Sequence, residues 1–268
     1  MGNKIDSFLI EAIKASLVAG EAIMEIYDSN SFEVDHKSDD SPLTQADIAS
    51  NAKIIAALSP TEVPIISEEI ANLPYAERKD WESCWIVDPL DGTKEFIKRN
   101  GEFTVNIALL DKGKLSIGVI YVPVHRQLYF TQPDMKKAYG LVWEDQECTL
   151  SNLMEQAEPL VPRKDSKILK VIGSKSHMNE LTRDYVDGLA MQDDRPLDIV
   201  AVGSSLKFCE VAAGKAEIYP RFGPTMEWDT AAGQAICEAA GLDVIQADTG
   251  VPLQYNKEDL YNPYFIVK

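Results

Sequence analysis

The sequence lacks long apolar runs, closely spaced cysteines and clustered histidines, and each absence excludes a class of protein. Its longest uncharged apolar stretches are only as long as strands, whereas a membrane-spanning helix needs roughly 20 residues. The 4 cysteines form no C-x-x-C pair and the 3 histidines lie far apart, which excludes a zinc site of the usual spacing. No cationic segment with an apolar core opens the chain. We therefore expect free thiols in a reducing cytoplasm and no transmembrane segment.

Basic residues are also scarce. The chain holds 26 Lys and Arg against 43 Asp and Glu, a formal net charge of −17 with an isoelectric point near 4.6. Such a surface repels nucleic-acid polymers and anionic lipid headgroups over long range, so we expect no nucleic-acid polymer as a partner. A small phosphate ligand stays compatible with this charge where a bound cation or a local basic patch reverses its sign.

The rest of the composition is that of a globular protein, and its patterning divides the chain in two. With 45% apolar and 26% charged residues over 268 positions, disorder, collagen and coiled coils are excluded. Residues 1–160 predict an α+β metal-binding domain with an antiparallel sheet. Residues 161–268 predict an α/β substrate-binding domain, because strands and helices alternate there. The overall fold class is therefore α/β.

The expected elements follow from periodicity and turn signals. Helices are predicted over residues 6–27, 44–58, 178–190, 204–213 and 230–240. Strands are predicted over residues 63–67, 84–88, 103–110, 115–122, 127–131, 137–142, 168–173, 199–202 and 216–219. A polar loop is expected over residues 28–41, and residues 151–162 are the linker candidate.

The strongest chemical signal lies where an apolar strand meets a tight turn, in the segment Trp-Ile-Val-Asp-Pro-Leu-Asp-Gly-Thr. The strand delivers Asp88, Pro89 ends its pairing, and Gly92 permits a sharp turn before a helix that begins at Thr93. With Asp91, two carboxylates then stand on one loop beside a helix N-terminus, which is typical of sites for divalent cations and phosphate. A surface turn with helix-capping acids explains the same turn residues, so both interpretations stay open.

Three further acids stand at strand ends or helix starts, and each has a plain structural alternative. Glu68 follows a strand and is equally a solvated strand end. Asp229 opens a helix and is a natural N-cap. Asp47 ends a Thr-x-x-Asp capping box, or acts as a base that polarises a hydroxyl and through it a water. Taken with Asp88 and Asp91, the acids Glu68 and Asp229 predict a Mg²⁺ site, because hard oxygen ligands must be brought together from distant segments.

Gly-Ser turns and basic residues form a separate group that predicts an anion pocket. Ser174 and His177 follow one expected strand, Ser204 and Lys207 follow a second, and Arg221 follows a third. Gly-Ser turns expose backbone N–H groups, and Lys and Arg supply positive charge. For His177 alone, an ordinary half-buried or capping role is the alternative.

The acidic motifs together resemble the signatures of the inositol monophosphatase superfamily of Mg²⁺-dependent, lithium-sensitive phosphatases, in order and spacing over essentially the whole chain. Residues 90–106, 203–209 and 219–225 look most like bacterial 3'(2'),5'-bisphosphate nucleotidases of sulfate assimilation. The resemblance implies a layered αβαβα sandwich of the sugar-phosphatase type. It also implies two or three Mg²⁺ ions, inhibition by Li⁺, and a cytoplasmic monomer or homodimer that in this family can also sit peripherally on the inner membrane.

The resemblance further implies roles residue by residue. The metal ligands would be Glu68, Asp88, the Leu90 carbonyl, Asp91 and Asp229. Asp47 and Thr93 would activate the water, with Glu68 as a further catalytic residue. Gly92 and Thr93 would contact the scissile phosphate through their backbone N–H groups, beside Glu68, Leu90, Asp91 and Asp229. The nucleotide and its other phosphate would be held by Ser174, His177, Ser204, Lys207 and Arg221.

The reaction so implied is in-line hydrolysis of the 3'-phosphate of adenosine 3',5'-bisphosphate, or of its 5'-phosphosulfate analogue. An inositol or sugar monophosphate phosphatase of the same superfamily is the runner-up. A non-catalytic anion- or metal-binding protein is the alternative of another class. Aspartyl-phosphate phosphatases carry Asp-x-Asp, and this motif is absent here because two residues separate Asp88 from Asp91.

Overall fold

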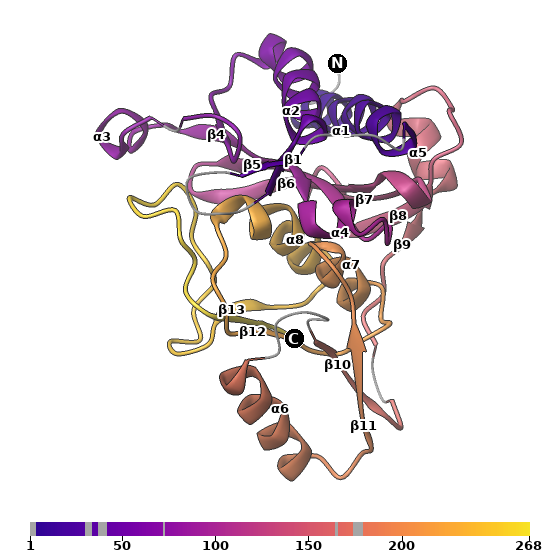
Figure 1. Ribbon diagram of the computed structural model, residues 1–268, viewed down its shortest axis with the longest axis vertical. Coiled ribbons are helices and arrows are strands. Elements are labelled where there is room, and N and C mark those ends of the chain that lie inside the picture. The colour runs from indigo at the N-terminus through magenta and orange to yellow at the C-terminus, as the bar shows by residue number, and fades with distance from the viewer. Residues whose placement is uncertain (1–3, 30–33, 37–41, 72, 164–165, 174–178) are drawn as a thin grey trace.

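The computed structural model describes residues 4–29, 34–36, 42–71, 73–163, 166–173 and 179–268. The layers follow one another in the order helices, large sheet, helices, small sheets and helix (Figure 1). The expected α/β class and αβαβα layering are therefore confirmed. No helix in these ranges combines the length and the apolar character that crossing a bilayer requires.

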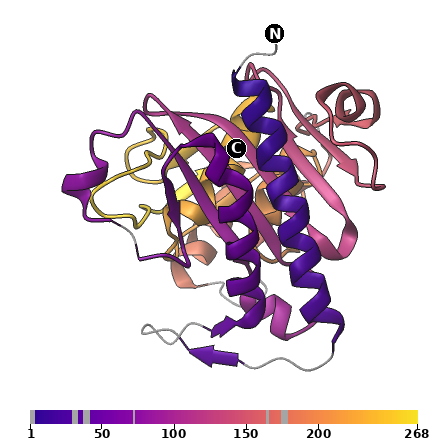
Figure 2. The same cartoon turned by 90° about the horizontal axis from the view of Figure 1, so that it is seen from above.

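The first layer consists of two helices side by side on one face of the large sheet (Figure 2). These are α1 (Lys4–Asp28) and α2 (Gln45–Leu58), close to the expected extents. The polar loop expected between them is partly wrong, since β1 (Val34–His36) pairs antiparallel with β2 (Pro42–Thr44). Strands of three residues are too short to show an alternating pattern in the sequence.

The second layer is a seven-stranded sheet in the order β3-β4-β5-β6-β7-β8-β9. Its pairs are antiparallel, as expected, except for the parallel edge pair β3–β4. The strands are β3 (Ile65–Ser67), β4 (Ser83–Asp91), β5 (Thr104–Asp111), β6 (Lys114–Val122), β7 (Gln127–Thr131), β8 (Ala138–Val142) and β9 (Glu158–Pro159). Short helices in its connections are η1 (Ser59–Thr61), α3 (Tyr75–Arg78), α4 (Thr93–Ile97), η2 (Pro123–His125) and α5 (Leu150–Gln156).

Two expectations for this sheet are wrong. Pro89 does not end β4, because the register with β5 shifts between Asp88 and Asp91 and the proline lies in that irregularity, where no ladder hydrogen bond is lost. Residues 151–162 are mostly not a linker, since they contain most of α5 and all of β9, which pairs with β8 at the edge of the sheet.

The remaining layers come from the second part of the chain. Helices α7 (Leu206–Ala212) and α8 (Glu227–Ala239) follow the large sheet, and α6 (Glu180–Gln192) forms the last layer (Figure 1). Between them lie a parallel pair and an antiparallel three-stranded sheet in the order β12-β14-β13. Their strands are β10 (Leu169–Gly173), β11 (Leu197–Ala201), β12 (Tyr219–Arg221), β13 (Val244–Gln246) and β14 (Phe265–Val267).

Helix α8 packs tightly on the sheet and joins the two parts of the chain. A Cβ on Gly118 of β6 would lie 2.7 Å from the Ala232 carbonyl oxygen, so this close approach requires glycine. One apolar cluster accordingly holds Ile86 of the large sheet together with Phe208 and Ile236. The division into domains at residue 160 stays a prediction, and these contacts show that the two parts share a core.

Candidate metal centre and anion pocket

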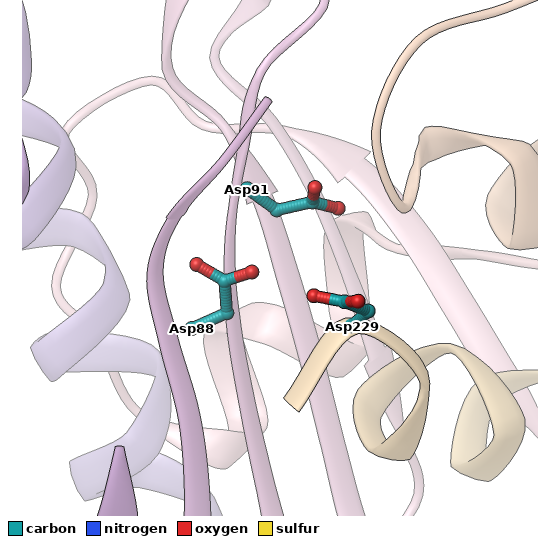
Figure 3. A group of neighbouring side chains, drawn as sticks. All are labelled: Asp88, Asp91 and Asp229. Atoms are coloured by element: carbon teal, nitrogen blue, oxygen red, sulfur yellow. The ribbon is translucent and has the colours of Figure 1, made fainter. Parts of the chain in front are cut away.

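Three carboxylates from two distant segments converge at the end of β4 (Figure 3). Asp88 and Asp91 come from β4, and Asp229 comes from the first turn of α8. One oxygen of each lies within 4.8 Å of the others. Glu68 follows β3, the parallel neighbour of β4, and hydrogen-bonds Asp88. The structure thus brings together four acids predicted as metal ligands, three of them as one compact group.

The electrostatics of this group favour a bound cation. Burial raises the pKa of Asp88 well above its usual range, and the nearby Glu68, Asp91 and Asp229 raise it further. Burial and then Asp91 raise the pKa of Asp229 to about 8. Buried acids this close are costly to ionise unless positive charge is supplied. Hard carboxylate oxygens suit a small divalent cation, so the donor set fits Mg²⁺.

Helix α2 holds both acid-bearing turns in place. The Ser50 hydroxyl donates to the Pro89 carbonyl oxygen at 2.6 Å, which fixes the turn that follows Asp88. The next residue of α2, Asn51, accepts a hydrogen bond from the Ser67 hydroxyl at 2.9 Å, which fixes the end of β3 just before Glu68. The polar face of one helix therefore positions ligands that come from two strands.

Asp47 is both a helix cap and a partner of Thr93. Its Oδ2 accepts from the Thr44 backbone N–H at 2.7 Å and from the Thr44 hydroxyl at 2.6 Å, which completes a capping box. Its Oδ1 lies 3.1 Å from the Thr93 hydroxyl oxygen, which donates to it. The Thr93 oxygen also lies 3.4 Å from the Leu90 carbonyl oxygen. The two interpretations weighed for Asp47 are thus compatible.

Asp229 is not the N-cap that the sequence indicated. Helix α8 begins at Glu227, three residues before the expected start, and Asp229 is its third residue. The Asp229 carboxylate accepts from the Met226 backbone N–H at 2.8 Å, from inside the first turn. The prediction is therefore correct that Asp229 lies at the start of this helix, and wrong about its position there, which is N3 and not the N-cap.

Two residues that hold Asp91 were not singled out from the sequence. Asp91 accepts from the Ser205 backbone N–H and, at 3.5 Å, from the Asn106 side-chain amide. Asn106 also donates to the Ser205 hydroxyl at 3.0 Å, and that hydroxyl donates to the Asp229 carbonyl oxygen at 2.8 Å. The available signal was Asn106, an amide within the mostly apolar strand β5.

A cavity of about 150 Å³ adjoins the acids. Its lining includes Asp91, Gly92, Ser204, Lys207, Arg221 and Asp229. At its rim, Gly92 has φ of 93°, and a Cβ there would lie 3.2 Å from the Ser204 Cβ, so both backbone and space require glycine. The turn after the acids and the start of α7 therefore meet at close range.

The cations of this cavity are short of anionic partners. Lys207 is only 7% exposed, its ammonium donates to the Ser204 carbonyl oxygen at 2.9 Å, and burial lowers its pKa to about 8. In the described part of the chain no carboxylate forms an ion pair with Lys207. The buried Nε of Arg221 likewise has no hydrogen-bond partner there. These groups suit an anion, whereas Ser174 and His177 lie outside the described residues.

Comparison with known proteins gives consistent matches over nearly the whole chain. A model of the inositol monophosphatase family matches residues 4–264. The 3'(2'),5'-bisphosphate nucleotidase CysQ of Shigella flexneri is 44% identical over 255 residues, which cover 93% of this chain and 94% of that protein. The crystal structure of CysQ from Bacteroides thetaiotaomicron aligns with a TM-score of 0.88 and 47% identity, over 98% of this chain and 97% of that one. Inositol monophosphatase from Anabaena shares the fold, with a TM-score of 0.67 over 98% of this chain and 90% of that one, at 22% identity.

Proposed function

Because this chain belongs to the inositol monophosphatase family, we propose that it hydrolyses the 3'-phosphate of adenosine 3',5'-bisphosphate to AMP and phosphate with the help of Mg²⁺. The observation that carries the proposal is the convergence of Asp88, Asp91 and Asp229 beside a cavity whose lining includes the cations Lys207 and Arg221. The acids suit a phosphoryl group bridged by Mg²⁺, and the cations suit a second phosphate. Relatives at 44% and 47% identity carry the name CysQ, and the first is called a bisphosphate nucleotidase.

The proposed metal ligands are the carboxylates of Glu68, Asp88, Asp91 and Asp229 together with the Leu90 carbonyl. The chemistry that Mg²⁺ supplies at such a site is neutralisation of phosphoryl charge and acidification of water. Without a cation, this cluster would repel a phosphate dianion, so the acids explain why the activity would require metal. Inhibition by Li⁺ and the use of two or three ions stay predictions from the family.

Asp47 and Thr93 are the proposed proton acceptors. Because the Thr93 hydroxyl donates its proton to Asp47 Oδ1, its oxygen presents lone pairs to a water. As the water oxygen bonds to phosphorus and the P–O3' bond breaks, the water's proton passes to Thr93 Oγ1 while the Thr93 proton passes to Asp47, and the released 3'-oxygen takes up a proton from solvent. The backbone N–H groups of Gly92 and Thr93, at the start of α4, are the proposed contacts of the phosphoryl oxygens.

Lys207 and Arg221 are the proposed holders of the 5'-phosphate. A guanidinium binds phosphate through a planar fork, and a buried ammonium acts as a point charge. Both groups line the same cavity as Asp91, Ser204 and Asp229. An inositol or sugar monophosphate has no second phosphate for them to bind. The pair therefore supports the bisphosphate over the monophosphate substrate.

The direct test is release of inorganic phosphate from adenosine 3',5'-bisphosphate, with Mg²⁺ and with EDTA. Inositol monophosphate serves as the competing substrate, and Asp91→Asn serves as the inactive control. We expect Mg²⁺-dependent release that is faster with the bisphosphate and is lost in the control. Preference for inositol monophosphate would establish the runner-up, and no release from either substrate would leave a binding protein.

A substitution at Arg221 separates the two phosphatase substrates. Arg221→Ala removes a charge-assisted contact to the second phosphate, so kcat/KM for adenosine 3',5'-bisphosphate should fall about 10–100-fold. Adenosine 3'-monophosphate lacks that phosphate, and its kcat/KM should stay nearly unchanged. The measurement is steady-state phosphate release with both nucleotides. Equal losses on the two would argue against a second-phosphate pocket.

The proposed setting is a reducing cytoplasm. All four cysteines are free thiols, and Cys84, Cys209 and Cys237 are buried. Burial raises the pKa of the Cys84 thiol to about 12, so this group stays protonated and unreactive. Free thiols support a cytoplasmic enzyme with a small phosphorylated nucleotide as its substrate.

A further inference from the structure

We propose that Arg78 is a positioning residue that keeps Glu68 and Asp229 at the correct separation for a shared cation. It acts through a strap, defined here as residues 254–262, which runs over the first turn of α8. This proposal rests on the proposed function, because it assumes that these carboxylates hold Mg²⁺. The reason for the proposal is that Asp88 and Asp91 both stand on β4, while Glu68 and Asp229 come from two other segments.

The strap is bound to the helix turn that carries Asp229. Glu227 has no exposed surface, and its carboxylate accepts from the Asn256 backbone N–H at 2.6 Å and the Lys257 backbone N–H at 3.0 Å. The Lys257 ammonium adds a third hydrogen bond at 2.6 Å. The Asn262 side-chain amide donates to the Met226 carbonyl oxygen at 2.7 Å. A movement of the strap would therefore move the start of α8.

Arg78 connects this strap to the segment that leaves Glu68. Its Nη1 donates to Asn256 Oδ1 at 2.7 Å, and the Asn256 amide donates back to the Arg78 carbonyl oxygen at 2.9 Å. Its Nη2 donates to the Glu258 carbonyl oxygen at 3.0 Å. Its Nε donates to the Leu73 carbonyl oxygen at 3.2 Å, five positions after Glu68. Figures 1 and 2 both show α3 on the same side of the molecule as yellow loops of the C-terminal part of the chain.

Burying the guanidinium of Arg78 costs free energy, so the presence of an arginine here requires a physical explanation. Arg78 is only 3% exposed, and in the described part of the chain its hydrogen-bond acceptors are carbonyl and amide oxygens, with no carboxylate in an ion pair. A buried guanidinium is expensive unless its donors are used. The planar fork reaches three separate points at fixed angles, which no shorter or more flexible side chain does.

Arg78 and Glu227 both lie near β4, the strand that carries Asp88 and Asp91. The thiol of Cys84 on β4 lies near enough to feel both the Glu227 and the Arg78 charges. Cys84 stands four positions before Asp88, and Glu227 stands two positions before Asp229. The tie between α3, the strap and α8 thus runs alongside the strand that ends in the other two acids. Partners of this kind orient ligands without touching the metal.

The test is calorimetric titration of the protein with Mg²⁺ alone, without substrate. We compare the wild type with Arg78→Met, which keeps much of the volume and removes every donor, and with Arg195→Met as the matched control. Arg195 lies between α6 and β11 and forms ion pairs with Asp193 and Glu217, which are not among the proposed metal ligands. Its loss should therefore lower thermal stability and leave the Mg²⁺ affinity unchanged. Loss of Arg78 should weaken Mg²⁺ binding about 10–100-fold, and saturating Mg²⁺ should restore most of kcat.

A second variant keeps the proposal testable if Arg78→Met does not fold. Asn256 has φ of 57°, so Asn256→Gly retains that backbone and its hydrogen bond to Glu227 while removing the reciprocal pair with Arg78. It should weaken Mg²⁺ binding in the same direction. Wild-type Mg²⁺ affinity in the folded Arg78 and Asn256 variants would overturn the positioning role alone. Failure of the wild type to bind Mg²⁺ would overturn the proposed function with it.

Discussion

At the scale of single residues, two acids of this site also accept hydrogen bonds at helix starts. Asp47 and Asp229 are each the third residue of a helix, and each accepts a backbone N–H from before the helix start. The positive end of a helix dipole stabilises a carboxylate and offsets part of the cost of burying it. Capping and the proposed roles of these acids therefore place the same requirement on both positions, which is why the sequence alone left them ambiguous.

Substitution of Thr93 tests the proposed proton transfer from the water through the Thr93 hydroxyl to Asp47. Thr93→Val keeps the shape and removes the group that donates to Asp47, so kcat should fall about 10²–10⁴-fold, the usual range for general acid–base catalysis. Mg²⁺ affinity should not change, because the acids are intact. Steady-state turnover and Mg²⁺ titration measure the two quantities. Thr93→Ser keeps the hydroxyl and should retain most activity; comparable losses in both variants would contradict the role.

Sequence predicted the residues whose role depends on their neighbours along the chain. Asp88 and Asp91 stand at the end of an apolar strand, so their exceptional position is visible locally. Arg78 and Asn256 are 178 positions apart, and nothing in either neighbourhood indicates the other. A lone arginine in a short polar segment looks like ordinary surface until the fold buries it.

At the scale of elements, the first turn of α7 buries Lys207, and this burial makes its positive charge sensitive to pH. Because burial lowers the pKa of Lys207 to about 8, the free enzyme loses that positive charge as the pH rises through this value. A cation near Asp91 would lower the pKa further, in the same direction. The kcat/KM for the bisphosphate should therefore fall above about pH 8. A pH profile of kcat/KM measures this fall. Lys207→Met should lower kcat/KM and abolish its fall above about pH 8. The same fall in the variant would contradict the assignment of this pH dependence to Lys207.

Elements were predictable where their pattern was long enough. Helix α1 and the β5–β6 hairpin have many apolar positions, and their extents agree with the sequence to within a few residues. The strand β1, which pairs with β2, and the strand β9, which pairs with β8, are too short to show an alternating pattern in the sequence. Pro89 misled in another way, because a proline ends a regular ladder but is tolerated at an irregularity, and this irregularity carries the acids.

At the scale of the whole molecule, a chain of net charge −17 buries some of its acids beside its cavity, and this should be visible in its stability. With its pKa raised to about 8, against an ordinary value of about 3.9, Asp229 binds a proton in the folded state and loses it on unfolding over that interval. Its stabilising contribution to the metal-free protein is thus fully present below about pH 4 and is lost as the pH rises to about 8.

The proposed Mg²⁺ would replace that proton, so the increase in Tm on adding Mg²⁺ should grow as the pH rises from about 5 to about 8. Thermal unfolding with saturating Mg²⁺ and with EDTA at several pH values measures the increase. Asp229→Asn, which cannot ionise, should reduce the pH dependence. An increase in Tm that is the same at every pH would contradict the coupling of protons and metal at this carboxylate.

The layered order of the molecule was expected from the family resemblance, and residue patterns alone did not determine it. Local periodicity predicts that strands exist, and it does not say that β3 pairs with β4 in parallel or that α8 packs on β6. Those contacts are set by burial of apolar faces over long sequence separations. They also bring Asp229 to Asp88, so the geometry of the site depends on the part of the fold that is least visible in the sequence.

The central claim is that acids from distant segments form one cation site beside a phosphate-binding turn. The most direct measurement is anomalous diffraction from crystals grown with Mn²⁺, which has the oxygen preference of Mg²⁺ and scatters anomalously. The account predicts an anomalous peak enclosed by Asp88, Asp91 and Asp229, which disappears in Asp91→Asn crystals. A map with Mn²⁺ peaks elsewhere on the protein and none between these carboxylates would contradict it.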